Sequence, residues 1–160
     1  MISYILALFC GVAVLIADQI TKHLIITTMS LNQQKDFING LIDLVYIHNR
    51  GGAWGIMQGK TVVLVVISVV LIAVCSFVMV KYRNNKLLFW SMSLILSGGI
   101  GNMIDRIFRE GQVVDFLHFE FWPTFPIFNV ADCAVVIGAG LLILYYVIDI
   151  FKEKQKNEQV

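Results

Sequence analysis

Long apolar runs alternate with polar segments along the chain, and four runs dominate the pattern. They lie at about residues 2–17, 61–80, 87–104 and 125–148. A helix needs about 20 apolar residues to cross the hydrocarbon core of a bilayer. The first three runs carry no charge, and the fourth carries only Asp132. The pattern predicts four transmembrane helices in a single domain that spans the whole chain.

The first run also has the position of a signal peptide. However, no Lys or Arg precedes it, and it contains no small-x-small cleavage signal. We therefore expect residues 2–17 to be retained as a helix.

The polar segment 18–60 is too long to lack structure in a compact protein. Asn39-Gly40 separates two stretches rich in strand-forming residues, which indicates a hairpin turn. The stretch DQITKHLIITTM (18–29) can lie along the membrane interface as an amphipathic helix. The expected fold class is an all-α membrane protein of four transmembrane helices with a small outer-side β-sheet and a surface amphipathic helix.

Basic residues predict the orientation, because short loops rich in Lys and Arg stay in the cytoplasm. KYRNNK (81–86) carries three positive charges, and Lys152, Lys154 and Lys156 follow the last run. We expect both termini in the cytoplasm and the polar segments 18–60 and 105–126 on the outer side.

Composition supports a membrane protein, since 58% of the residues are apolar and only 14% are charged. A soluble domain has about 45–50% apolar and about 25% charged residues. The net charge of +1 suggests no attraction to nucleic acid. Cys10, Cys75 and Cys133 are far apart in apolar sequence, which is neither a disulfide framework nor a metal-binding pattern.

Ionisable residues close to membrane depth are the candidate functional groups, because each costs roughly 2.5–3.5 kcal/mol at mid-bilayer. Asp18 and Lys22 are four residues apart and share a helix face. An ion pair that ends the first span is an equally good interpretation of this pair.

HNRGGAWG (48–55) brings Asn49, glycines that allow close backbone approach, and the interfacial residue Trp54 together. Taken alone, it can also be a plain surface turn.

GNMIDR (101–106) places Asn102, Asp105 and Arg106 within one helical turn, so all three can face one site at the outer end of the third span. The alternative is an Asp–Arg pair that closes the helix.

Two further aspartates lie at the borders of apolar sequence. Asp115 stands in VVDF, and Asp132 follows Asn129 by three residues in FNVAD. The 16 residues between them are rich in Phe and Pro, enough for a loop that turns back and lets the carboxylates meet. A solvated loop aspartate plus a helix-capping aspartate is the alternative.

Two carboxylates in a low-dielectric cleft cannot both ionise easily. If they share one proton, one can activate water while the other protonates an amide carbonyl oxygen. Such a pair titrates as a unit, so neither member is assigned the proton.

Five motifs together resemble the bacterial lipoprotein signal peptidases, also called signal peptidase II, in order and spacing: DQ-x-x-K (18–22), N-x-G-x-A-W (49–54), G-N-x-x-D-R (101–106), V-V-D-F (113–116) and F-N-x-A-D (128–132). Each motif alone is weak, but five in order cover nearly the whole chain. One departure is Gly52, where the family more often has Ala.

The resemblance implies an aspartyl endopeptidase of the bacterial cell membrane that needs no cofactor or metal. Its substrates would be prolipoproteins, cut on the amino side of a diacylglyceryl-modified cysteine, in contact with membrane lipids. By motif, the catalytic pair would be Asp115 and Asp132. The residues lining the site would be Asn49, Gly51, Asn102, Arg106 and Asn129. The supporting residues would be Asp18, Lys22, Trp54 and Asp105.

Other classes fit the sequence less well. It has no HExxH zinc motif, GIGN (99–102) lacks the aspartate of a presenilin-type GxGD, and Ser97 has no nucleophile setting that would make His118 its partner. A channel or carrier would need polar residues along the inner halves of the spans, which are apolar in the second and fourth. A pure assembly factor would not need two carboxylates.

Overall fold

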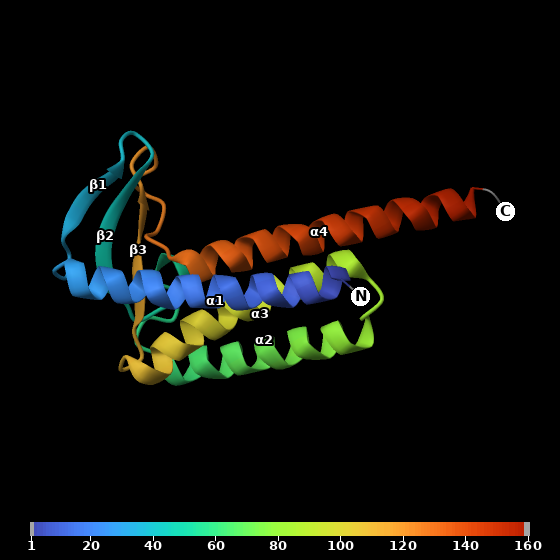
Figure 1. Cartoon of the computed structure of the whole chain (residues 1–160), viewed down its shortest axis with the longest axis horizontal. Helices are drawn as coiled ribbons and strands as arrows, with labels where there is room; N and C mark the ends of the chain where they lie inside the picture. Colours follow the sequence, from blue (N-terminus) through green and yellow to red (C-terminus); the bar gives the residue numbers. More distant parts are fainter. Residues whose placement is uncertain (1, 159–160) are drawn as a thin grey trace.

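The computed structural model describes residues 2–158, which form four long helices and one three-stranded sheet (Figure 1). The helices are α1 (Ile2–Thr28), α2 (Thr61–Lys81), α3 (Lys86–Phe108) and α4 (Val130–Asn157). Each is long and apolar enough to cross a membrane. The prediction of four spans is confirmed.

The helices expose large apolar side chains over most of their outer surface. Phe9 on α1, Val62 on α2 and Val136 on α4 are each at least 70% exposed. Such a surface is expected in lipid and rare in a soluble monomer. By contrast, α3 contacts the other three helices and buries more than half of its apolar segment. The chain is therefore a multi-pass membrane protein with α3 at the centre of the bundle.

Small residues bring α3 close to its neighbours, as is usual between helices in membranes. The Ser93 hydroxyl donates to the Ala7 carbonyl of α1 (2.8 Å), and the Ser91 hydroxyl donates to the Gly138 carbonyl of α4 (2.7 Å). Gly98 faces α4 so closely that an added Cβ would lie 2.3 Å from the Ala131 carbonyl oxygen.

The sheet has the order β1-β2-β3, with both strand pairs antiparallel. Its strands are β1 (Gln34–Ile38), β2 (Ile42–Asn49) and β3 (Val113–Phe119). Gly40 has a φ of +75° in the turn between β1 and β2, which confirms the predicted hairpin. The sheet lies at one end of the bundle, and the start of α1 and the end of α4 lie at the other (Figure 1).

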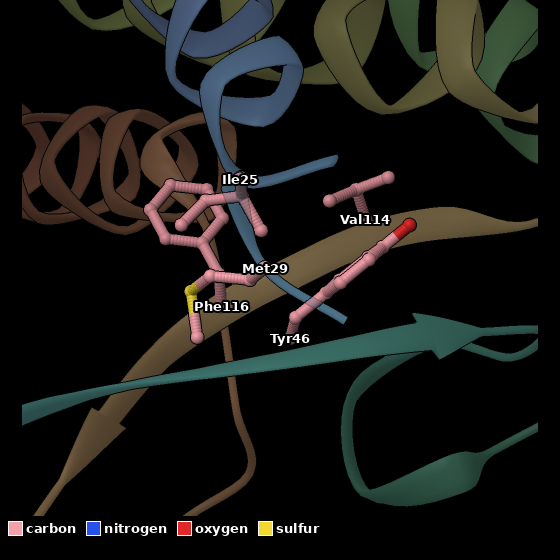
Figure 2. Packing of buried hydrophobic residues seen from close by; sticks show 5 residues of the cluster. All are labelled: Ile25, Met29, Tyr46, Val114 and Phe116. Carbon is pink, nitrogen blue, oxygen red and sulfur yellow. The ribbon is translucent and has the colours of Figure 1, made fainter. Parts of the chain in front are cut away.

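A small core joins the sheet to the end of α1 (Figure 2). Ile25 and Met29 pack against Tyr46 of β2 and against Val114 and Phe116 of β3, and all five side chains are buried. This core fixes β3 relative to α1, with Asp115 between two of its buried residues.

Two expected boundaries were wrong. Residues 18–28 form no separate surface helix but continue α1, because Asp18 and Lys22 pair with each other inside the bundle and need not reach the interface. The fourth helix begins at Val130 and not near residue 125, because Phe128 pairs with Leu117 of β3 through both its N–H and its carbonyl.

Candidate active site

Asp115 lies on strand β3 and is 2% exposed. The alternative of a solvated loop aspartate is therefore wrong for Asp115: β3 pairs with β2, and Asp115 lies opposite Ile47. Its carboxylate accepts hydrogen bonds from the side-chain amides of Asn49 (2.9 Å) and Asn129 (2.6 Å). Asp115 is thus held by amide donors from two different elements.

Asp132 lies in the first turn of α4, where it forms a capping box with Asn129. The Asn129 side chain accepts from the Asp132 N–H (2.9 Å), and Asp132 Oδ2 accepts from the Asn129 N–H (3.1 Å). The capping interpretation was therefore correct for one oxygen of Asp132. The other oxygen, Oδ1, accepts from the Asn102 side-chain amide of α3 (2.8 Å).

Asn129 brings the two carboxylates together. It is fully buried, its Nδ2 donates to Asp115, and its backbone N–H donates to Asp132. Burial and the charge of Asp132 raise the pKa of Asp115 to about 7, although the hydrogen bonds from Asn49 and Asn129 and the charge of Lys22 oppose the rise.

Each of the three asparagines uses its oxygen to fix the direction of its NH₂ group. Asn49 Oδ1 accepts from the Gly51 N–H (2.8 Å), and Asn129 Oδ1 accepts from the Asp132 N–H. Asn102 Oδ1 accepts from Lys22 Nζ and from Asn129 Nδ2, both at 3.1 Å. All three NH₂ groups consequently point at a carboxylate of the pair.

A buried ion cluster lies beside this pair. Lys22 is fully buried and contacts Asp18 Oδ2 (2.9 Å) and Asp105 Oδ2 (3.0 Å). Asp105 also accepts from Arg109 (3.1 Å), so its helix-closing partner is Arg109 and not the adjacent Arg106. The i,i+4 ion pair expected for Asp18 and Lys22 is present, but within a larger cluster.

The two aspartates of the cluster also hold the backbone that carries the pair. Asp18 Oδ1 accepts from the Ala131 N–H at the start of α4 (2.9 Å), and Asp105 Oδ2 accepts from the Val114 N–H of β3 (3.1 Å). Asp105 therefore faces the ion cluster and supports Asp115 through its neighbour. Of the three residues expected to face one site, Asn102 and Asp105 both contact the Lys22 ammonium, whereas Arg106 donates to the Gly51 carbonyl.

Arg106 connects α3 to the loop after β2. Its guanidinium donates to the carbonyls of Gly51 (3.1 Å) and Asn102 (3.3 Å), while its buried Nε has no hydrogen-bond partner among residues 2–158. Gly51 is buried, and its added Cβ would lie 3.0 Å from the Ile56 carbonyl, which explains a glycine there. An added Cβ at Gly52 would make only an ordinary contact at 3.6 Å, so an alanine would also fit at this position.

A groove of about 380 Å³ opens beside Asn49, between residues 47–58 and 124–127. Trp54 lies at its wall, is 68% exposed and meets the Phe125 ring edge-on at a centroid distance of 5.8 Å. A peptide lying in this groove would pass next to a residue that binds Asp115.

Two contributors to the site were missed from the sequence. Gln19 Nε2 donates to Asp18 (3.0 Å), Asp105 (3.3 Å) and the Gly101 carbonyl (3.2 Å). Gly101 leaves room for Asp18, since an added Cβ would lie 2.7 Å from Asp18 Oδ2. Gln19 lies in the motif DQITK and Gly101 lies in the motif GNMIDR, so these motifs could have indicated both residues.

Fold and site together define a class: a multi-pass membrane protein with a buried pair of carboxylates held by amide donors at one end of the helices. Among residues 2–158, no three His, Cys, Asp or Glu side chains gather in a way that could hold a metal ion.

Comparison with known proteins gives the family. The family model described as "Signal peptidase (SPase) II" matches residues 10–148. The lipoprotein signal peptidase of Halothermothrix orenii is 42% identical over 132 residues, which are 82% of this chain and 88% of that protein. The chain belongs to the signal peptidase II family.

Two solved structures agree with the fold. One, described as a bacterial membrane enzyme determined by the in meso method at 2.3 Å resolution, has a TM-score of 0.85 and 33% identity over 90% of this chain and 88% of that one. Another of the same description, at 1.9 Å resolution, has a TM-score of 0.80 and 33% identity over 88% of this chain and 91% of that one.

Proposed function

We propose that the chain is an aspartyl endopeptidase that removes signal peptides from prolipoproteins, with Asp115 and Asp132 as its catalytic residues. Membership of the signal peptidase II family supports the reaction. The observation that carries the assignment of the residues is Asn129, which binds both carboxylates and holds them together although they come from β3 and α4.

In the proposed mechanism the pair holds one proton and the scissile amide lies between the two carboxyl groups. The ionised carboxylate takes a proton from water, whose oxygen attacks the carbonyl carbon, and the protonated carboxyl gives its proton to the carbonyl oxygen. Collapse of the tetrahedral intermediate breaks the C–N bond. The carboxyl that took the proton from water gives it to the leaving nitrogen, and the other carboxylate takes a proton back from a hydroxyl of the intermediate, so the pair again holds one proton. The raised pKa of Asp115, about 7, allows the pair to keep one proton near neutral pH.

The neighbouring donors support this chemistry. The NH₂ groups of Asn49, Asn102 and Asn129 are already directed at the carboxylates, so they need no reorganisation during the reaction.

The substrate is proposed to be the diacylglyceryl form of the precursor, cut on the amino side of the modified cysteine. Acyl chains that remain in the bilayer hold the bond near the membrane boundary and contribute about 0.8 kcal/mol per buried CH₂. The sheet end of the bundle, which carries the pair, is proposed to face the outer side. The basic segment 81–86 and the lysines after residue 151 would then be cytoplasmic.

A gel assay with purified protein in detergent tests the proposal. We expect the diacylated prolipoprotein to be cut and its unlipidated form to be cut poorly or not at all. Equal cutting of the two forms would contradict the lipid requirement, and no cutting of the diacylated form would contradict the function.

A further inference from the structure

We infer that Lys22 is a positioning residue for the proposed peptidase reaction, because its ammonium group fixes the side-chain amide of Asn102 with the NH₂ group toward Asp132. The inference rests on the proposed function, but it concerns a residue that reaches the catalytic pair only through another side chain.

All three N–H bonds of the Lys22 ammonium are in use. They point to Asp18 Oδ2 (2.9 Å), Asp105 Oδ2 (3.0 Å) and Asn102 Oδ1 (3.1 Å), and the side chain is 0% exposed. Since the ammonium is buried, its direction is set by these three oxygens.

The two aspartates do not depend on Lys22 alone. Asp105 has a second cation in Arg109, and Asp18 accepts from the Ala131 N–H at the N-terminus of α4, where the helix dipole favours an anion. Charge neutralisation therefore does not account for the third contact of Lys22, which goes to the uncharged Asn102.

Asn102 is also the asparagine that needs this contact. The oxygens of Asn49 and Asn129 are fixed by backbone N–H groups, whereas the donors to Asn102 Oδ1 within residues 2–158 are two side chains, Lys22 and Asn129. A flipped Asn102 amide would turn its NH₂ group toward the Lys22 ammonium and its oxygen toward the Asp132 carboxylate. Lys22 thus excludes the orientation in which Asp132 would lose its donor and face another oxygen.

The test uses a charge-balanced pair of variants. Lys22→Met combined with Asp18→Asn removes one buried cation and one buried anion, and Asp18→Asn alone is its matched reference. Against the diacylated prolipoprotein we expect the double variant to show kcat about 10- to 100-fold below the reference, with KM within about 2-fold, because the substrate contacts remain while a donor to Asp132 is misplaced.

A mutant cycle separates positioning from a general structural role. If Lys22 acts through Asn102, adding Lys22→Met after Asn102→Leu, both in the Asp18→Asn reference, should lower kcat by less than about 2-fold. Equal kcat in the charge-balanced variant and its reference would overturn the inference, and so would a Lys22 effect that persists at full size without Asn102.

If the charge-balanced variant does not fold, Asn102→Asp serves as the second test, because it removes the donor that Lys22 is inferred to position. Aspartate keeps an acceptor for Lys22 but replaces the donor to Asp132, so we expect a folded protein with kcat reduced about 100-fold or more and KM near wild type. Wild-type kcat in Asn102→Asp would overturn the inference. Inactivity of the wild-type protein toward the diacylated precursor would instead contradict the proposed function itself.

Discussion

Gly98→Ala is expected to disturb the proposed catalytic pair, Asp115 and Asp132, from a position that touches neither carboxylate. The new Cβ would lie 2.3 Å from the Ala131 carbonyl oxygen and 2.7 Å from Val135 Cγ2, both on α4. The Ala131 oxygen belongs to the backbone, so a change of side-chain rotamer cannot relieve this clash. The two helices have to separate by roughly 1 Å before the contact becomes an ordinary one.

The displacement acts directly on the site. Ala131 immediately precedes Asp132, and Gly98 is one helical turn from Asn102, so separation stretches the 2.8 Å hydrogen bond between Asn102 and Asp132. Overpacking typically costs about 1–3 kcal/mol of stability. A misplacement of about 1 Å near reacting groups can lower the rate about 100-fold.

Gly140→Ala is the matched control, because Gly140 lies on the facing helix α4 and its added Cβ meets nothing within 4 Å. Alanine there is expected to leave cleavage unchanged and to raise helix stability by up to about 1 kcal/mol. Both variants are compared with wild type by cleavage rate and by thermal unfolding in detergent. If Gly98→Ala is as active and as stable as Gly140→Ala, the close contact between α3 and α4 does not hold the site.

Three further predictions use independent measurements. The pKa of Asp115 is raised from 3.8 to about 7, so the stability from its proton is fully present below about pH 4 and is lost as pH rises through 7. Asp115→Asn should remove that fall in thermal unfolding curves between pH 4 and 7, and equal pH slopes for the two proteins would contradict this. EDTA or 1,10-phenanthroline should leave cleavage unchanged, whereas a loss that zinc restores would contradict a carboxylate mechanism. A reporter fused after Val160 should be active only if it matures in the cytoplasm, and activity of an exported reporter there would reverse the proposed orientation.

The sequence predicted the number of spans well, because their apolar length is a local property. It predicted the ends of the helices poorly where buried polar residues pair with one another. Asp18 seemed to end the first span, yet α1 continues to Thr28 because Lys22 neutralises Asp18 inside the bundle. A partner that makes a buried charge tolerable is invisible to hydropathy when the packing is unknown.

Strand β3 shows a second limit. Its pairing with β2 joins segments more than 60 residues apart, as in the contact between Asn49 and Asp115, so VVDF alone did not indicate a strand. The contact between Asp105 and Lys22 likewise joins α3 to α1 and follows from no local spacing. The capping box of Asn129 and Asp132 was readable in FNVAD, but the apolar run on both sides hid where the helix begins.

The most direct test of the central claim is cleavage of a diacylated prolipoprotein by Asp115→Asn, Asp132→Asn and the double variant, each purified and shown to be folded. Asparagine keeps the size of the side chain but cannot exchange the proton, so each single variant should lose at least about 100-fold in rate. The double variant should be little slower than either single one, because the two carboxylates act as a unit. Activity above about 10% of wild type in either folded single variant would show that the pair held by Asn129 is not the catalytic pair.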